Sequence, residues 1–181
     1  MEQDGRFFVY WNKKYMVYET DEEEIDTITI YRKYMGIKKH VIPEETRIIV
    51  KGSDGNERDV NEEAIFYFKQ QGLNAVRTKS YIEMKKGDYA LHNFLDNSKI
   101  RRIISNEDLK KIKSREDPYV RIYQLDMTGY PDLFVWNNDS NYFFVEVKSE
   151  NDKFHLNQRE WIKWNRRIGK FKFKILEIKK K

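Results

Sequence analysis

The sequence predicts an α/β fold in which a mixed β-sheet is flanked by helices. From residue 62 onward, the residue pattern indicates a helix, a strand, an insertion, two strands, a helix and a final strand. The aromatic residues (12 Tyr, 11 Phe and 4 Trp) provide ample core material, so a disordered chain is excluded. We therefore expect one compact α/β unit, to which a β-rich N-terminal extension is attached.

That N-terminal extension is expected over residues 1–58. Aromatic and β-branched runs at 6–11 and 15–20 predict a hairpin, and further strands are expected at 25–34 and 46–51. A cluster of Ser, Asp, Gly and Asn at 53–56 is typical of a turn after the last of these strands.

A helix is predicted from residue 61 to residue 71. Asn61 is a suitable N-cap, Glu62 and Glu63 place carboxylates in the first turn, and Gly72 ends the helix. A short strand at 73–79 follows. These elements begin the second unit, which we expect over residues 59–181.

A charged insertion at about 81–128 separates this strand from the rest of the core. Helices are expected near 89–95 and 106–114, and Pro118 interrupts the pattern.

The last third of the chain has the clearest pattern. Strands are predicted at 130–136 and 142–148, joined by a turn at 137–141. A helix over 155–168 ends at Gly169, and a last strand covers 171–178.

The composition narrows the class of protein. The 181 residues include no cysteine, which excludes disulfides, a thiol nucleophile and a zinc–thiolate site. No apolar run approaches the ~18 residues of a membrane span, and the first residues are polar. We therefore expect an intracellular protein of the cytoplasm, nucleoid or nucleus, with no membrane partner.

The charge is unevenly distributed along the chain. Residues 1–98 carry 15 Lys and Arg against 18 Asp and Glu, whereas residues 99–181 carry 20 against 12. This difference, −3 against +8, suggests a polyanionic partner for the second half, although a Lys-rich solvated surface would give the same composition.

The predicted hairpin brings acidic residues together. If its turn is centred on Asp139, then Asp132 lies directly across from Glu146, and Lys148 shares the face of Glu146. Two facing carboxylates suit Mg²⁺ or Mn²⁺, and the Val147 carbonyl could add a third oxygen. The alternative is a turn-proximal Asp beside a surface Glu–Lys pair; the surrounding Phe, Val and Leu favour the metal site.

These residues also resemble a known signature. Tyr130-Pro131-Asp132 followed by Glu146-Val147-Lys148 is similar to the motif of the PD-(D/E)XK nucleases. The segments 129–133 and 144–148, followed by Asp152, Gln158 and Trp161, resemble the VRR-Nuc (virus-type replication-repair nuclease) branch. The resemblance covers roughly residues 62–80 and 129–178, and a virus-encoded source is compatible with it.

The resemblance implies an α-β-β-β-α-β restriction-endonuclease-like core and a set of roles. Asp132 and Glu146 would bind Mg²⁺ or Mn²⁺, and Lys148 would activate water. Glu63 would bind metal directly or through water, with Glu62 as the alternative helix acid. Gln158 would orient the lysine or a phosphate.

The helix at 155–168 offers a candidate nucleic-acid-binding face. Basic side chains gather on it and just before it: Lys153, His155, Arg159, Lys163, Arg166 and Arg167. Such residues would contact phosphates without reading sequence, although a solvated helix face is an equal interpretation. Trp161 is expected to pack on the sheet.

The resulting hypothesis is a Mg²⁺- or Mn²⁺-dependent endonuclease acting on DNA, selective for junctions, flaps or other branched structures in replication, repair or recombination. Alternatives are a sequence-specific restriction-type nuclease, a ribonuclease on the same core, and a non-catalytic nucleic-acid-binding module. A homodimer is one arrangement suited to cutting two strands.

Overall fold

The computed structural model describes most of the sheet and its helices. The described residues are 6–10, 13–17, 25–41, 44–78, 98–114, 130–139, 141–153, 155, 158–159, 161–162, 165 and 171–181. The predicted helix near 89–95 lies outside these residues, as does Gly169.

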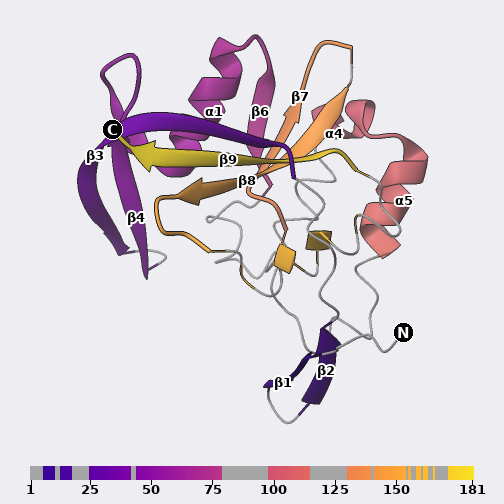
Figure 1. Ribbon diagram of the computed structural model, residues 1–181. Helices are drawn as coiled ribbons and strands as arrows, with labels where there is room; N and C mark the ends of the chain where they lie inside the picture. The colour runs from indigo at the N-terminus through magenta and orange to yellow at the C-terminus, as the bar shows by residue number, and fades with distance from the viewer. Residues whose placement is uncertain are drawn as a thin grey trace.

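Seven strands form one mixed sheet (Figure 1) in the order β5-β4-β3-β9-β8-β7-β6. Their bounds are β3 Thr27–Val41, β4 Glu44–Lys51, β5 Glu57–Asp59, β6 Asn74–Arg77, β7 Leu133–Trp136, β8 Tyr142–Ser149 and β9 Phe173–Lys180. The helices are α1 Val60–Gln70, α4 Ser98–Ile103 and α5 Asn106–Ser114. The predicted α/β class is confirmed, and so is the predicted helix at 106–114.

The central strand of the sheet is β9, which is parallel to both of its neighbours, β8 and β3. On one side of β9, the strands β8, β7 and β6 are antiparallel to one another, and on the other side β3, β4 and β5 are also antiparallel. The meander β6-β7-β8 with β9 beside it has the strand order that the resemblance implied.

The predicted N-terminal hairpin is confirmed as a separate two-stranded sheet. Its strands are β1 Arg6–Tyr10 and β2 Lys13–Val17, and they are antiparallel. The second strand begins two residues earlier than expected, which leaves a shorter connection.

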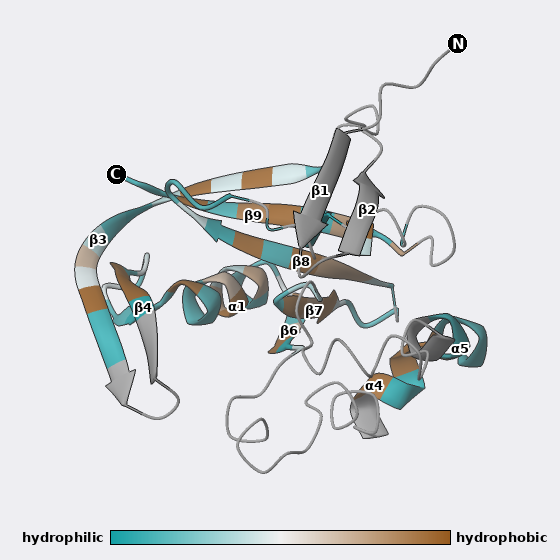
Figure 2. Ribbon diagram, turned by 90° about the horizontal axis from the view of Figure 1, so that it is seen from below, coloured by the Kyte–Doolittle hydropathy of each residue, from teal (hydrophilic) through white to brown (hydrophobic). Residues whose placement is uncertain are grey.

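The strand predicted at 25–34 is longer in the structure. β3 continues to Val41, past a β-bulge between Tyr34 and Gly36, where Gly36 has a φ of 126° that favours glycine. Alternating hydrophobic and hydrophilic bands along β3 are visible in Figure 2. Strands β3, β4 and β5 are hydrogen-bonded into the main sheet, so the sheet crosses the expected boundary after residue 58. The boundary between two units at that position stays a prediction.

Helix α1 begins one residue earlier than predicted, and its N-cap is Asp59. The Asp59 side chain accepts a hydrogen bond from the Glu62 backbone N–H at 2.8 Å, and the Glu62 side chain accepts one from the Asp59 N–H at 3.2 Å. This reciprocal capping box satisfies two backbone donors, so the prediction of Asn61 as the cap is wrong. Gly72, at φ 75°, ends the helix as expected.

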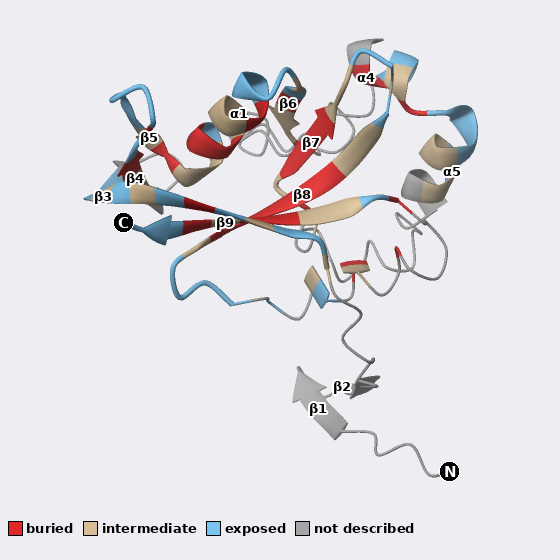
Figure 3. Cartoon of the chain, turned by 45° about the horizontal axis from the view of Figure 1, so that its top comes forward, coloured by how far each residue is buried: buried red, intermediate tan, exposed pale blue. Residues whose placement is uncertain are grey.

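Apolar side chains pack on both faces of the sheet around β7 and β8, whose ribbons are largely coloured as buried in Figure 3. On one face, Ala64 and Phe68 of α1 pack with alternate residues of β7, β8 and β9, including Val145 and Leu176. On the other face, a second cluster is formed by Ile100, Ile104, Phe134, Phe144, Trp161 and Phe171. The expectation that Trp161 packs on the sheet is confirmed, since its side chain is 1% exposed.

The helix predicted at 155–168 is described only in part. Residues 158–159 and 161–162 are helical, and the helix bounds lie outside the described residues.

Candidate active site

The hairpin of β7 and β8 has the predicted register. Leu133 pairs with Val145, and Val135 pairs with Phe143. Leu133, Val135 and Val145 belong to the apolar cluster beneath α1. Because side chains alternate along a strand, their neighbours in sequence project from the opposite face of the sheet.

Glu146 and Lys148 lie on this opposite face and are almost completely buried. Their exposed fractions are 2% and 5%. The Lys148 Nζ lies 3.2 Å from Glu146 Oε1, so the two charges form a buried ion pair. Such a pair is tolerable only when further hydrogen bonds satisfy its remaining polar atoms.

Gln158 supplies those hydrogen bonds. Its Oε1 accepts from Lys148 Nζ at 2.8 Å, and its Nε2 donates to Glu146 Oε1. Lys148 Nζ also donates to the Lys153 carbonyl at 3.2 Å, and the His155 N–H donates to Gln158 Oε1 at 2.9 Å. The segment after β8 therefore closes over the ion pair, and Gln158 is in contact with both charged groups.

Asp132 lies just before β7 and reaches across to β8. Its Oδ2 accepts a hydrogen bond from the Val147 N–H at 2.9 Å, and its carbonyl accepts one from the Thr78 N–H at 3.0 Å. Because the Val147 N–H belongs to the peptide joined to Glu146, the Asp132 carboxylate lies against the backbone between Glu146 and Lys148. The structure thus brings Asp132 to the segment that carries the other two predicted residues.

Glu63 is held in a different way. Its side chain is fully buried, with Oε1 2.5 Å from Arg32 Nε and Oε2 2.9 Å from Arg58 Nη1. Glu62, the alternative helix acid, is exposed and serves the capping box. Of the two acids, Glu63 is therefore the one with a buried carboxylate, and its role as a metal ligand stays a prediction.

The donor set suits a hard divalent cation. Carboxylates from Asp132 and Glu146 come from neighbouring strands, and the Val147 carbonyl lies between Glu146 and Lys148 in sequence. Within the described ranges, no group of three or more Asp, Glu or His side chains is placed to hold one metal ion. Asp132 and Glu146 would therefore be the two carboxylate ligands of such a cation, and other oxygens would fill its remaining positions.

The predicted nucleic-acid-binding residues are partly described. Lys153, His155 and Arg159 are exposed next to Gln158. Lys163, Arg166 and Arg167 lie outside the described residues. The backbones of Lys153 and His155 contact the buried residues Lys148 and Gln158, and contact of the three side chains with phosphates stays a prediction.

A network of arginines around the start of α1 was not expected from the sequence. Asp59, 4% exposed, pairs with Arg77 at 2.7 Å and with Arg47 at 2.9 Å. Burial raises the pKa of Asp59, but the Glu62 N–H and these arginines lower it by more, so the net shift is downward. The sequence contained one signal for Asp59: it lies three residues before Glu62, which is the spacing of a capping box and identifies Asp59 as a helix N-cap.

A second acid, Asp54, belongs to the same region. Arg58 donates to both of its oxygens, at 2.9 and 2.7 Å, and this lowers the pKa of Asp54. Arg58 therefore links the turn before β5 to the buried Glu63.

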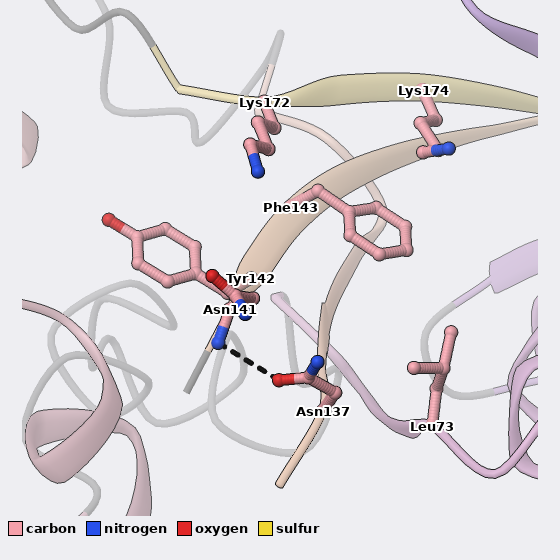
Figure 4. A pocket seen from close by; sticks show the side chains of 7 residues that line it. All are labelled: Leu73, Asn137, Asn141, Tyr142, Phe143, Lys172 and Lys174. Atoms are coloured by element: carbon pink, nitrogen blue, oxygen red, sulfur yellow. Dashed lines mark hydrogen bonds between the residues drawn. The ribbon is translucent and has the colours of Figure 1, made fainter. Parts of the chain in front are cut away.

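A shallow cavity of about 360 Å³ lies elsewhere, beside the β7–β8 turn. Figure 4 shows Phe143 between Lys174 and Leu73, and the Lys174 Nζ lies 5.3 Å from the centroid of the Phe143 ring. Leu73 and Phe143 pack against the α1-side cluster, so this cavity is on the face opposite Glu146 and Lys148. It is separate from the candidate active site.

Comparisons with known proteins agree with the predicted family. Residues 89–176 match the family model of the VRR-NUC domain. This range contains Asp132, Glu146, Lys148 and Gln158, whereas Glu63 lies outside it. The resemblance identified from the sequence is confirmed.

Among solved structures, the chain is similar to that of paFAN1 bound to 2-nucleotide 5′ flap DNA with a gap. The identity is 11% and the TM-score 0.47; the alignment covers 90% of this chain and 39% of the other. The chain thus spans about 39% of that protein's length. No curated protein matches the sequence. Among the described elements, no helix has the length and apolar character that crossing a membrane requires.

Proposed function

Because the chain carries a VRR-NUC domain, which is a nuclease domain, over residues 89–176, we propose that it is a Mg²⁺- or Mn²⁺-dependent endonuclease acting on DNA. We further propose that it prefers branched substrates, such as flaps or junctions. A homodimer, an intracellular location and a virus-encoded source remain predictions.

The observation that supports this proposal best is the buried arrangement of Glu146, Lys148 and Gln158, with Asp132 beside it. A carboxylate and an ammonium that are 2% and 5% exposed require a reason to be retained in a core. Here each is hydrogen-bonded to one glutamine, and a second carboxylate reaches the same backbone. A purely structural surface Glu–Lys pair would not be buried in this way.

Phosphodiester hydrolysis needs a nucleophile and charge stabilisation. When bound, the cation would supply Lewis-acid stabilisation of the charge that develops on the phosphate. Asp132 and Glu146 would hold it, and Lys148 would orient the attacking water and offset charge on a phosphate oxygen. A bond forms between the water oxygen and phosphorus, and the bond from phosphorus to the departing sugar oxygen breaks. The attacking water loses a proton to solvent, and solvent water protonates the departing sugar oxygen.

Gln158 is a positioning residue in this proposal. It accepts from Lys148 and donates to Glu146, so it fixes the separation of the two groups. Loss of this contact is expected to move the lysine relative to the phosphate and lower kcat more than it changes KM.

The test is a cleavage panel of labelled flap, junction, single-stranded and linear duplex DNA, together with matching RNA, in Mg²⁺ and in Mn²⁺. Asp132→Asn retains an oxygen that can accept from the Val147 N–H but removes the charge. We expect it to lower the cleavage rate by about a hundredfold or more. Asp139→Asn is the matched control, because Asp139 is an exposed acid in the turn of the same hairpin.

Each outcome of the panel decides between functions. Equal cleavage by wild type and Asp132→Asn would contradict the proposed site. Cleavage of RNA alone would make the protein a ribonuclease, and cleavage only at one duplex sequence would make it a restriction-type enzyme. DNA binding with no metal-dependent cleavage of any substrate would make it a binding module.

A further inference from the structure

The face of the sheet that carries Glu146 and Lys148 continues beyond them onto β3. Along β3, Ile28, Ile30 and Tyr34 pack against the α1-side cluster, and Ile30 is 8% exposed. The alternate residues face the other way and are exposed, and among them Tyr31 is 58% exposed. An exposed tyrosine ring offers an apolar face with a polar hydroxyl, which can stack on a nucleobase or pack on a sugar.

Strand β9 connects this part of β3 to the candidate active site. Lys148 of β8 is paired with Glu177 of β9, and Glu177 is paired with Thr29 of β3. The Thr29 hydroxyl is 3.3 Å from Glu177 Oε2, and Lys179 Nζ is 2.9 Å from the same oxygen. These contacts place the side chains of Thr29, Glu177 and Lys179 on one face.

Two further lysines extend the surface to β4. Lys33 lies directly across from Lys51 in the β3–β4 ladder, and both are exposed. In the described part of the chain, neither ammonium has an ion-pair partner. Like charges directly opposite each other in a ladder destabilise it, so a bound anion would relieve a cost that the free protein bears.

The charges on this surface leave a positive excess. Lys179 is compensated by Glu177, and Glu57 of β5 lies across from Lys51. Among the described residues, Lys33 has no such acidic neighbour in the register. Lysines spaced along a ladder can each contact a different phosphate of a polyanion.

We propose that this surface, the lysine platform (Thr29, Tyr31, Lys33, Lys51 and Lys179), binds the backbone of the DNA substrate next to the candidate active site. The inference rests on the proposed function and specifies its substrate path. Lys33 and Lys51 contact phosphates, and Tyr31 packs on a sugar or an unpaired base. The strands β8, β9, β3 and β4 are neighbours (Figure 1), so Lys148 and Lys51 are three strand spacings apart across the sheet, about 14 Å. Lys51 lies opposite Lys33, which is four residues, about 13 Å, along β3 from Thr29, and Thr29 lies level with Lys148. Lys148 and Lys51 are therefore about 19 Å apart, or roughly six base pairs of B-form DNA.

The test measures binding separately from cleavage. Anisotropy of a labelled flap DNA is recorded in EDTA over a range of salt concentrations, for wild type and for Lys33→Ala/Lys51→Ala. Each lost phosphate contact reduces the slope of log K against log [salt] by about 0.9, so the double variant should lose about 1.8. The matched control is Lys69→Ala/Lys172→Ala, which removes two exposed lysines, one on α1 and one just before β9.

The outcomes separate this proposal from the proposed function. A smaller slope in the platform variant alone supports the lysine platform. Equal slopes in wild type and platform variant would refute it, even if the wild type cleaves DNA. If the salt-dependence slope is smaller for the platform variant but the wild type cleaves no substrate, the lysine platform is supported and the proposed nuclease function is refuted. Equal loss in both double variants would mean that binding follows net charge alone, and the platform would be rejected.

Discussion

Lys148 is expected to stabilise the fold as well as to act in hydrolysis. Its ammonium contacts Glu146 Oε1, Gln158 Oε1 and the Lys153 carbonyl, at 3.2, 2.8 and 3.2 Å. Lys148→Met removes the charge but retains most of the buried apolar stem. It leaves the carboxylate of Glu146, which is 2% exposed, without this counter-ion.

Breaking one partner of a buried ion pair costs about 3–5 kcal/mol. Glu146 would keep its hydrogen bond from Gln158 Nε2, so the lower value, about 3 kcal/mol, is expected. This corresponds to an increase of roughly 150-fold in the unfolding equilibrium constant. The double variant Glu146→Gln/Lys148→Met removes both charges and should return to within about 1 kcal/mol of wild type, because no unpaired charge is buried.

The assay is urea unfolding at pH 7, monitored by tryptophan fluorescence. Lys148→Met should unfold at a lower urea concentration than wild type, with the same dependence of the unfolding free energy on urea concentration. Lys111→Met is the control, because Lys111 pairs with the exposed Glu107 on α5 at 2.7 Å, and loss of a solvent-screened pair should leave the unfolding midpoint almost unchanged. The reasoning is refuted if Lys148→Met is as stable as wild type, or if the double variant is as unstable as the single one.

Two further predictions concern the region around α1. Asp59→Ala should lower the free energy of unfolding by about 4 kcal/mol at pH 7, and Asp59→Asn by about 3, since asparagine can still cap the helix. Because the pKa of Asp59 is lowered in the folded state, this stabilisation is present above the ordinary aspartate pKa and is lost as the pH falls through the lowered value. The free energies of unfolding of wild type and Asp59→Asn should therefore converge in acid, which urea titrations at several pH values would check. A difference in unfolding free energy that does not change with pH would contradict the ion pairs of Asp59. Gly52→Ala should lower the free energy of unfolding by about 1–3 kcal/mol, because the added Cβ would lie 2.3 Å from Arg58 Nη1 and 2.6 Å from Glu63 Oε2. Thermal unfolding measures this change, and an unchanged midpoint would show that these side chains are not packed against Gly52.

The hairpin and its register could be predicted because both are local. A turn of Asn and Asp between two short apolar runs determines which residues face each other, so Leu133 opposite Val145 followed from counting. The shared face of Glu146 and Lys148 followed from the two-residue repeat of a strand. Their contact with Gln158 came only from the family resemblance, since a helix ten residues away could approach the strand in several ways.

The arginine contacts could not be predicted, because they join residues far apart in the sequence. Arg32 reaches Glu63 across 31 positions, and Thr29 meets Glu177 across 148. Hydrophobic periodicity determines which face of a strand is buried, but not which strand lies beside it. For the same reason, β3 could be recognised as a strand while its parallel pairing with β9 could not.

The cap of α1 is a different kind of error. Asn61 and Asp59 are both good N-cap residues, and the apolar pattern that begins near residue 64 fits either start. The decisive signal was Glu62, three residues after Asp59, which completes the capping box. Helix ends are therefore better assigned from reciprocal pairs of polar residues than from a single cap candidate.

The parallel pairing of β9 with both β8 and β3 links the segment that matches the VRR-NUC model to the strands before it. Of the eleven buried residues in the α1-side cluster, six lie outside the range 89–176: Ile30, Val50, Ala64, Phe68, Ala75 and Ile178. The segment that matches the family thus supplies Asp132, Glu146, Lys148 and Gln158, but less than half of the apolar layer behind them. Since a buried ion pair needs a rigid, dry surrounding, residues 25–78 are part of what holds the candidate active site together.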